Sequence, residues 1–425
     1  MKPALPAIVG AMLLAGAATT AANWSSFRGE SARGVGTGTP PVTWDLATGT
    51  NVAWKTAIPG LGHSSPIVWG DRVYVTTAVA TRGTETALVT GTMEVVGHEM
   101  ARDMSEHEWR LYALDRATGK ILWQQAARRT APSSQRHRKA SHASATPATD
   151  GKYIVAMMGS EGLFCYDVEG KLPWKKDFGV LDLGMAGNPA IQWGPASSPV
   201  IAGDRVIVQN DGHKPMPGQT DADPPNSFLA AFDLATGKQA WRVYTSDQPS
   251  WSTPLVMREG ERTLVITTAP LAVRARDAAN GKEVWRMEDE ALVRVPSPIP
   301  FGDSVLVTGG APPAGRPILA IPLASTKNVS REKLTWQIDK GSPYTVTPLV
   351  YDGILYVLMD NGVLSAYDAA TRADLYRVRL GAGRNAFSAS PVAAGGHLYF
   401  ANEDGDLFVV RAFRHQRIKQ AKIRF

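Results

Sequence analysis

The phrase Asp115-Arg116-Ala117-Thr118-Gly119-Lys120, followed by Trp123, recurs along the chain and decides the fold. It returns as Asp233-Leu234-Ala235-Thr236-Gly237-Lys238 before Trp241, and as Asp277-Ala278-Ala279-Asn280-Gly281-Lys282 before Trp285. In all three copies the Trp follows the Asp by eight residues. Self-similarity of this kind indicates a repeat architecture before any single residue is interpreted.

Degraded copies extend the repeat over most of the chain. They run from Asp45 to Trp54, from Asp167 to Trp174 and from Asp368 to Tyr376. A short run of alternating apolar residues precedes each Asp, which is the pattern of a strand. Asp and Gly then predict a tight turn, and the Trp begins the next strand.

A second unit follows each Trp, in which a small or hydroxyl residue precedes Pro and a short apolar strand. Its hydroxyl residues are Ser65, Thr146, Ser198, Thr253, Ser297, Thr347 and Ser390. Hairpin dipeptides such as Gly70-Asp71 and Asp352-Gly353 come after these strands. Each repeat therefore reads as four short antiparallel strands, and the small residues suit an innermost strand near a central axis.

Four-stranded units repeated every ~40–50 residues predict an all-β fold, a β-propeller of four-stranded antiparallel blades. We expect the repeat residues to be structural and identify no catalytic residue and no metal ligand. The Trp side chains are expected to pack between neighbouring blades. The structural repeat residues are Trp54, Trp123, Trp174, Trp241, Trp285 and Trp336, with Asp115, Gly119, Asp233, Gly237, Asp277 and Gly281.

The repeated phrase resembles the docking motif of quinoprotein alcohol dehydrogenase-like propellers, the bacterial PQQ-like repeat family. The resemblance extends from Trp24 to about Val410. It implies a propeller and two kinds of activity. Some members are dehydrogenases of alcohols or sugars that use pyrroloquinoline quinone (PQQ) with Ca²⁺ and an acidic base. Others, such as a lipoprotein of outer-membrane barrel assembly, present a surface to other proteins. A WD-type propeller is the alternative fold.

The number of blades stays open at the level of sequence. Seven complete sets of inner strands are found, and the strand at Trp54 precedes the first set. One alternative is a ring of seven closed by the Trp54 strand. The other, which we favour, is an eight-blade ring left incomplete, because no further set follows Val410.

Three segments are expected. Residues 1–22 have the pattern of a signal peptide, with Lys2, an apolar stretch and small residues. Residues 23–410 form the propeller, and 411–425 are a basic C-terminal tail. We therefore expect a periplasmic or secreted protein without a membrane span.

Cysteine and charge exclude several functions. Cys165 is the only cysteine, so the adjacent cysteine pair of alcohol-oxidising family members and a c-type haem motif are both excluded. The net charge of +6 arises from the last fifteen residues, which carry six basic residues and no acid. We therefore predict no nucleic-acid partner.

Long insertions are expected on one face of the ring. The segments 78–109, 124–141, 179–194, 210–226 and 309–317 all fall in connections that share an end of the blades. We expect this face to bind a protein partner or a small ligand. Candidate acids on it are Asp211, Asp221 and Asp223, and His137 and His142 are candidate metal ligands for which a surface or partner-contact role is favoured.

The sequence thus favours a non-catalytic binding or assembly module that requires no cofactor. The alternative is a PQQ-dependent dehydrogenase of alcohols or sugars, with PQQ and Ca²⁺ as its cofactors. No zinc motif of the His-Glu-x-x-His type is found, because His107-Glu108 is followed by Trp109-Arg110-Leu111.

Overall fold

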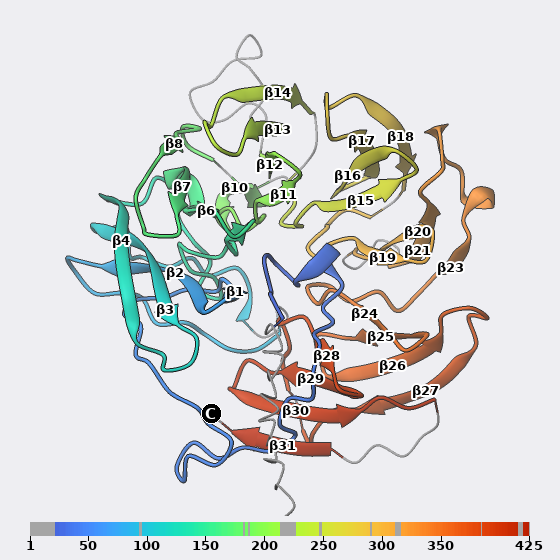
Figure 1. The fold of residues 1–425 in the computed structure, drawn as a ribbon. Helices are drawn as coiled ribbons and strands as arrows, with labels where there is room; N and C mark the ends of the chain where they lie inside the picture. Colours follow the sequence, from blue (N-terminus) through green and yellow to red (C-terminus); the bar gives the residue numbers. More distant parts are fainter. Residues whose placement is uncertain are drawn as a thin grey trace, which may run out of the picture.

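The computed structural model describes residues 22–92, 96–181, 183–185, 188–212, 227–245, 249–289, 291–310, 316–383, 385–414 and 420–424. Regular structure in these ranges is β, apart from three short 3₁₀ turns. These are η1 (Glu30–Ala32), η2 (Gly159–Glu161) and η3 (Arg331–Lys333). Seven sheets of four or five strands, here numbered 1 to 7 in chain order, stand around a central axis (Figure 1). The predicted β-propeller is confirmed.

The first three sheets come from the N-terminal half. Their strands are β1 (Ile67–Trp69), β2 (Arg72–Ala80), β3 (His107–Asp115) and β4 (Ile121–Thr130) in sheet 1; β5 (Ala148–Thr149), β6 (Tyr153–Met157), β7 (Leu163–Asp167) and β8 (Trp174–Lys176) in sheet 2; and β11 (Val200–Ala202), β12 (Arg205–Asn210), β13 (Phe228–Asp233) and β14 (Gln239–Tyr244) in sheet 3. Between sheets 2 and 3 lies a two-stranded hairpin, β9 (Gly184–Met185) and β10 (Asn188–Gln192).

Sheets 4 and 5 follow the same order, and β22 (Lys327–Asn328) adds a parallel fifth strand to sheet 4. Their other strands are β15 (Leu255–Glu259), β16 (Arg262–Ala269), β17 (Ala272–Asp277) and β18 (Glu283–Glu288) in sheet 4, and β19 (Ile299–Phe301), β20 (Ser304–Val307), β21 (Ile318–Pro322) and β23 (Trp336–Ile338) in sheet 5.

The last two sheets complete the set. Their strands are β24 (Leu349–Tyr351), β25 (Ile354–Leu358), β26 (Val363–Asp368) and β27 (Asp374–Arg379) in sheet 6, and β28 (Val392–Ala394), β29 (His397–Ala401), β30 (Asp406–Arg411) and β31 (Gln420–Arg424) in sheet 7. The middle strands are the most buried, and apolar clusters such as that of Leu255, Val273 and Leu319 fill the space between neighbouring sheets.

Trp123, Trp174 and Trp241 each reach from their own sheet to the Asp-Gly turn of the next. The Trp174 Nε1–H donates to the Leu234 carbonyl oxygen over 2.9 Å, and the Trp241 Nε1–H donates to that of Ala278 over 2.9 Å. The turn glycine leaves room for the indole: a Cβ on Gly237 would lie 2.6 Å from Trp174 Cδ2. The glycine and the Trp are therefore two halves of one contact between sheets.

Trp336 departs from this pattern. Its Nε1 has no hydrogen-bond partner among the described residues, and its ring packs 5.7 Å from Phe301 and 6.3 Å from Tyr367, between centroids.

The alternative of a ring closed by the Trp54 strand and the expected tail at 411–425 are both wrong. Trp54 lies outside any strand, and its Nε1–H donates to Arg116 O on sheet 1 over 2.8 Å, so it does not close sheet 7. The outer strand of sheet 7 is instead β31, which lies in the segment 411–425 expected as a tail and pairs with β30. Trp54 thus takes the place on sheet 1 that each repeat Trp takes on the following sheet.

The N-terminal segment, residues 22–41, joins sheet 7 to sheet 1. Trp24 exchanges backbone hydrogen bonds with Val68 of β1, and Gly34 and Gly36 do the same with Ala393 of β28. The Tyr399 hydroxyl of sheet 7 donates to the Pro40 carbonyl oxygen over 3.3 Å. In Figure 1 this segment runs in blue past the centre of the ring, where η1 contacts β15 and β19.

Arg28 anchors the segment beside the axis. Its guanidinium is 3% exposed and donates to the carbonyl oxygens of Pro348 (2.9 Å), Pro391 (3.2 Å) and Ala32 (3.2 Å). Burial lowers the pKa of Arg28 to about 9. The group therefore stays charged at neutral pH and binds sheets 6 and 7 through their backbones.

A cavity on the axis and its insertion-bearing face

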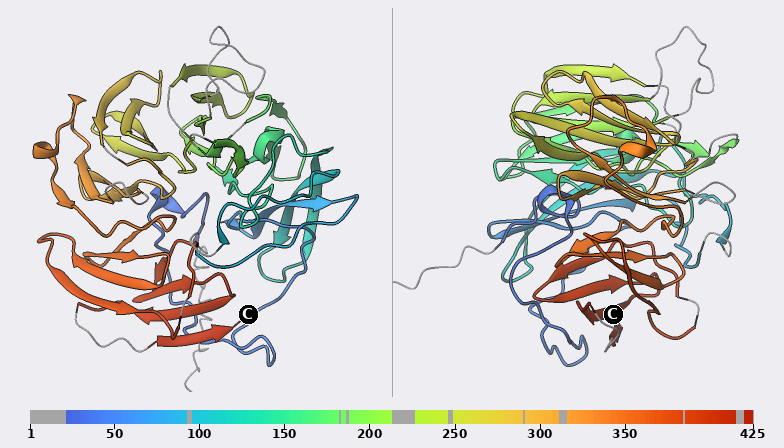
Figure 2. Two further views of the ribbon diagram at one scale, coloured as in Figure 1. Left: turned by 180° about the vertical axis from the view of Figure 1, so that it is seen from behind. Right: turned by 90° about the vertical axis from the view of Figure 1, so that its right-hand side faces the viewer.

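The connections β2–β3 (81–106), β4–β5 (131–147) and β8–β11 (177–199) leave the same end of the sheets. We call this end of the ring the insertion-bearing face. In the side view of Figure 2 the blue-green and green connections extend to the right of the ring. Most of 210–226 and 309–317, including Asp221 and Asp223, lies outside the described residues.

A cavity of about 1070 Å³ follows the axis, and its lining extends from the N-terminal segment (Trp24, Trp44) to the insertion-bearing connections (Lys139, Trp193). The hydroxyl residues that precede each Pro line its waist and are joined in series. The Ser65 N–H donates to Thr146 Oγ1 over 2.9 Å, the Thr146 N–H to Ser198 Oγ over 2.9 Å and the Ser198 N–H to Thr253 Oγ1 over 3.1 Å. Links to Ser297, Thr347 and Ser390 continue the chain at 2.8–3.1 Å.

This hydroxyl chain gives the small residues a second role besides fitting the narrow axis. Each side-chain oxygen accepts from the backbone N–H of the preceding sheet and so fixes neighbouring innermost strands to each other. No bond between Ser390 and Ser65 closes the series within the described parts of the chain. The series is therefore open where the N-terminal segment joins sheets 7 and 1.

On the insertion-bearing face, side chains of sheets 1 and 7 contact each other across the gap between these two sheets. Lys139 Nζ lies 2.6 Å from Glu403 Oε1, and the Gly91 N–H donates to Glu403 Oε2 over 2.8 Å. Thr90 adds a hydrogen bond to Asp404 of 3.3 Å. Because Glu403 belongs to the β29–β30 turn of sheet 7, the long connections of sheet 1 hold both ends of the ring together.

Aromatic side chains line the cavity on this face. The lining includes Trp193, Trp251, Tyr344 and Phe387. Trp193 stacks on His137 with ring centroids 4.0 Å apart and an angle of 19°, and it meets Trp251 edge-on at 6.1 Å. The Trp251 Nε1–H donates to Gly194 O over 3.1 Å, which fixes this cluster in place.

The two carboxylates in the described lining are already engaged by the chain. Asp360 accepts the backbone N–H groups of Tyr344 and Thr345, both at 2.9 Å, and the Thr345 hydroxyl at 2.6 Å. Glu403 accepts Lys139 and Gly91, as described above. Neither carboxylate is therefore free to act as a base toward a bound molecule.

The side chain of His63 lines the cavity and is exposed within it. Desolvation within the cavity, and after it the nearby positive charge of Arg136, lower the pKa of His63. The imidazole is consequently neutral at pH 7. The cavity on this side thus presents aromatic rings, hydroxyl groups and a neutral imidazole.

The candidate residues Asp211, His137 and His142 are packed inside the protein and do not form one site. Asp211 is 3% exposed and accepts from the Gln209 amide, so it is buried and is not a solvated loop acid. His137 accepts the Lys139 N–H at Nδ1 (3.1 Å), and its Nε2 lies 3.0 Å from Gly97 O, so both ring nitrogens are engaged. His142 is brought instead toward His107 and Asp103.

Cys165 is fully buried in sheet 2, and burial raises the pKa of its thiol to about 12. We predict that the native protein does not react with Ellman's reagent at pH 8, whereas one thiol per chain reacts in guanidinium chloride. Rapid reaction of the native protein would contradict the placement of Cys165.

A Ca²⁺-bound quinone would need several oxygen ligands from the cavity lining. Calcium takes about six to eight oxygen ligands, several of them commonly carboxylates. The lining carboxylates Asp360 and Glu403 already accept hydrogen bonds from the chain itself. A calcium ion bound to the described lining would compete with these donors for both carboxylates.

The repeats match known proteins over most of the chain. The family model described as outer membrane protein assembly factor BamB matches residues 107–294 and 272–424. BamB from Moraxella catarrhalis is similar in structure at 15% identity, with 86% of this chain and 87% of that chain covered and a TM-score of 0.52. A search of curated proteins finds no match.

Two dehydrogenases share the fold to the same degree. A europium-containing methanol dehydrogenase is 12% identical, covers 92% of this chain and 89% of its own, and gives a TM-score of 0.55. The quinohemoprotein alcohol dehydrogenase from Comamonas testosteroni is 15% identical, with 94% and 79% covered and a TM-score of 0.53. At such low sequence identity, the structural similarity shows a common fold and does not show a common activity.

Proposed function

Since the chain belongs to the PQQ-like β-propeller family described as outer membrane protein assembly factor BamB, we propose that it is an exported, non-catalytic module that binds a protein partner on its insertion-bearing face. The observation that carries the proposal is the aromatic-lined cavity whose described carboxylates are both engaged. Aromatic side chains fixed at the centre of a surface are typical of the residues that dominate protein interfaces.

Exposed apolar side chains support the same face. Leu88, Val180, Leu271 and Leu292 all belong to connections on the insertion-bearing side, and Leu292 is 51% exposed. They add exposed apolar area to this face, and burial of such area stabilises association. In the described part of the chain, no helix is long and apolar enough to cross a membrane.

The second candidate function is a PQQ-dependent dehydrogenase, which the structural similarity to two dehydrogenases favours. It requires a base and calcium ligands, whereas both carboxylates of the described lining already accept donors of the chain itself. The discriminating assay incubates the purified protein with PQQ and CaCl₂ and follows reduction of an artificial dye by alcohols or sugars. We expect no rate above that of PQQ alone, and a rate that depends on the protein would support the dehydrogenase.

Site-specific photo-crosslinking tests the binding face. A photoreactive phenylalanine analogue at Leu292 reports on the insertion-bearing face. The same analogue at Leu172, which is 43% exposed in the turn between β7 and β8, reports on the opposite face. We expect a discrete crosslinked partner from Leu292 in the cell envelope and none from Leu172. Crosslinking from Leu172 alone would contradict the proposal.

A further inference from the structure

Three metal-binding side chains converge inside sheet 1 and its connections. Asp103 lies in the β2–β3 connection, His107 begins β3 and His142 lies in the β4–β5 connection. One ligand atom from each lies within 4.8 Å of the other two. Asp103 and His107 are almost completely buried, at 2% and 1% exposure.

The atoms that face one another have no hydrogen-bond partner among the described residues. They are Asp103 Oδ1, His107 Nε2 and His142 Nε2. His142 Nε2 and Asp103 Oδ1 are 3.9 Å apart, which is too long for a hydrogen bond. A buried polar atom left unpaired costs about 1–3 kcal/mol, so three such atoms at one point require an explanation.

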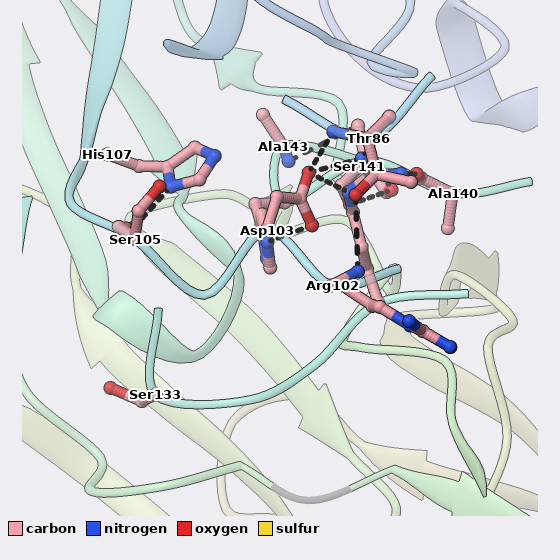
Figure 3. Close-up of polar contacts among 12 residues, drawn as sticks. Thr86, Arg102, Asp103, Ser105, His107, Ser133, Ala140, Ser141 and Ala143 are labelled. Carbon is pink, nitrogen blue, oxygen red and sulfur yellow. Dashed lines mark hydrogen bonds and ion pairs between the residues drawn. The ribbon is translucent and has the colours of Figure 1, made fainter. Parts of the chain in front are cut away.

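Hydrogen bonds hold the side chains of His107 and Asp103 on the side that faces away from the cluster. His107 Nδ1 lies 2.7 Å from Ser105 O and therefore carries the ring hydrogen, which leaves the Nε2 lone pair free (Figure 3). Asp103 Oδ2 accepts the Arg136 Nε–H over 3.1 Å, which leaves Oδ1 free. Hydrogen bonds that orient a ligand in this way are common behind metal-binding His and Asp.

We infer that Asp103, His107 and His142 form a binding site for a divalent transition-metal ion of the zinc type. Two imidazole nitrogens and one carboxylate oxygen are ligands that Zn²⁺ accepts, with distances of about 2.0–2.2 Å. Around a tetrahedral ion these distances place ligand atoms about 3.4 Å apart, so from within 4.8 Å of one another the ligand atoms need to approach by about 1.4 Å at most.

A fourth ligand has room beside the cluster. A small cavity of about 10 Å³ touches His142 and is also lined by Trp109 and Arg136. This volume holds about one water molecule.

The ion would tie together the two connections that bridge the ring. The β2–β3 connection supplies Gly91 and the β4–β5 connection supplies Lys139, and both contact Glu403 of sheet 7. A metal shared by Asp103 and His142 therefore fixes these connections relative to each other. This role is structural and does not depend on the proposed partner binding.

The test uses the full-length protein after dialysis against a chelator. Titration with ZnCl₂ by calorimetry is expected to saturate at one equivalent and to raise the melting temperature. CoCl₂ is expected to give the visible absorption of a tetrahedral site. The variants H107Q and H142Q, checked for folding by circular dichroism, should each lose the cobalt spectrum. H397Q in sheet 7, away from the cluster, should retain it.

Two results would overturn the inference. One is the absence of zinc binding by the folded wild-type protein. The other is an unchanged cobalt spectrum in folded H107Q and H142Q, because the metal would then bind elsewhere. Exchange of backbone amide hydrogens provides a further readout, since zinc should slow exchange in 81–106 and 131–147 of the wild type and not of the variants.

Discussion

Replacing Trp285 with alanine is expected to lower the free energy of unfolding by about 4 kcal/mol, the largest effect we predict for one side chain. The Trp285 ring is 0% exposed, and its Nε1–H donates to Leu323 O over 3.2 Å. The substitution removes an indole from between sheets 4 and 5 and leaves a buried carbonyl unpaired. Equilibrium unfolding in urea, followed by circular dichroism, measures the change.

Trp285→Phe is the matched control. It keeps most of the apolar volume and loses the N–H donor, so we expect a loss of about 1–2 kcal/mol. Equal losses in the two variants would show that the hydrogen bond, and not packing between the sheets, dominates the contact.

Gly237→Ala is expected to cost about 3 kcal/mol, because two unfavourable effects add. Gly237 has φ of 68°, a conformation that costs an alanine about 1–2 kcal/mol, and its Cβ would lie 2.6 Å from Trp174 Cδ2. Relief of this clash requires movement of the docked indole and adds about 1–3 kcal/mol. Urea unfolding of the purified variant provides the measurement.

Gly203→Ala separates the two effects within the same sheet. Gly203 has φ of 62°, and a Cβ there would meet nothing within 4 Å. We therefore expect a loss of about 1–2 kcal/mol from backbone conformation alone. If both glycine variants lost the same stability, docking of Trp174 against Gly237 would contribute nothing.

The repeat made the fold predictable from local signals. The Asp-Gly turns and the alternating runs before them lie close together in the sequence, so each sheet could be placed without knowledge of the others. The family likeness was carried by the same residues, and the match over 107–424 confirms it. What joins the ends of the ring depends on contacts between residues more than 300 positions apart, such as Arg28 with Pro391.

The error at β31 has a physical cause. The outer strand of a sheet exposes one face to solvent, as the alternating burial of β4 shows. Its sequence can therefore be polar and charged, and the basic residues after Val410 did not exclude a strand. The Asp45 to Trp54 phrase resembles the repeat that precedes an outer strand, which is why Trp54 was expected in a strand. Its indole instead docks on sheet 1, and β31 takes the outer place in sheet 7.

The Asp103, His107 and His142 cluster could not be read from spacing. His107 was considered with its neighbours in sequence and His142 with His137, whereas the two ligands are 35 positions apart. The long β3–β4 hairpin carries the missing signal, because His107 lies opposite Thr130 and the β4–β5 connection begins directly after Thr130. Recognising that register would have placed His142 within reach of His107.

The affinity for the partner that crosslinks from Leu292 tests the binding role most directly. Calorimetry with the purified partner would compare the wild type, the double variant Leu271→Ser/Leu292→Ser and Leu172→Ser. All three leucines are exposed, so the substitutions should not affect folding. We predict that Kd rises about tenfold or more in the double variant and is unchanged in Leu172→Ser. An unchanged Kd in the double variant, or a loss confined to Leu172→Ser, would contradict binding on the insertion-bearing face.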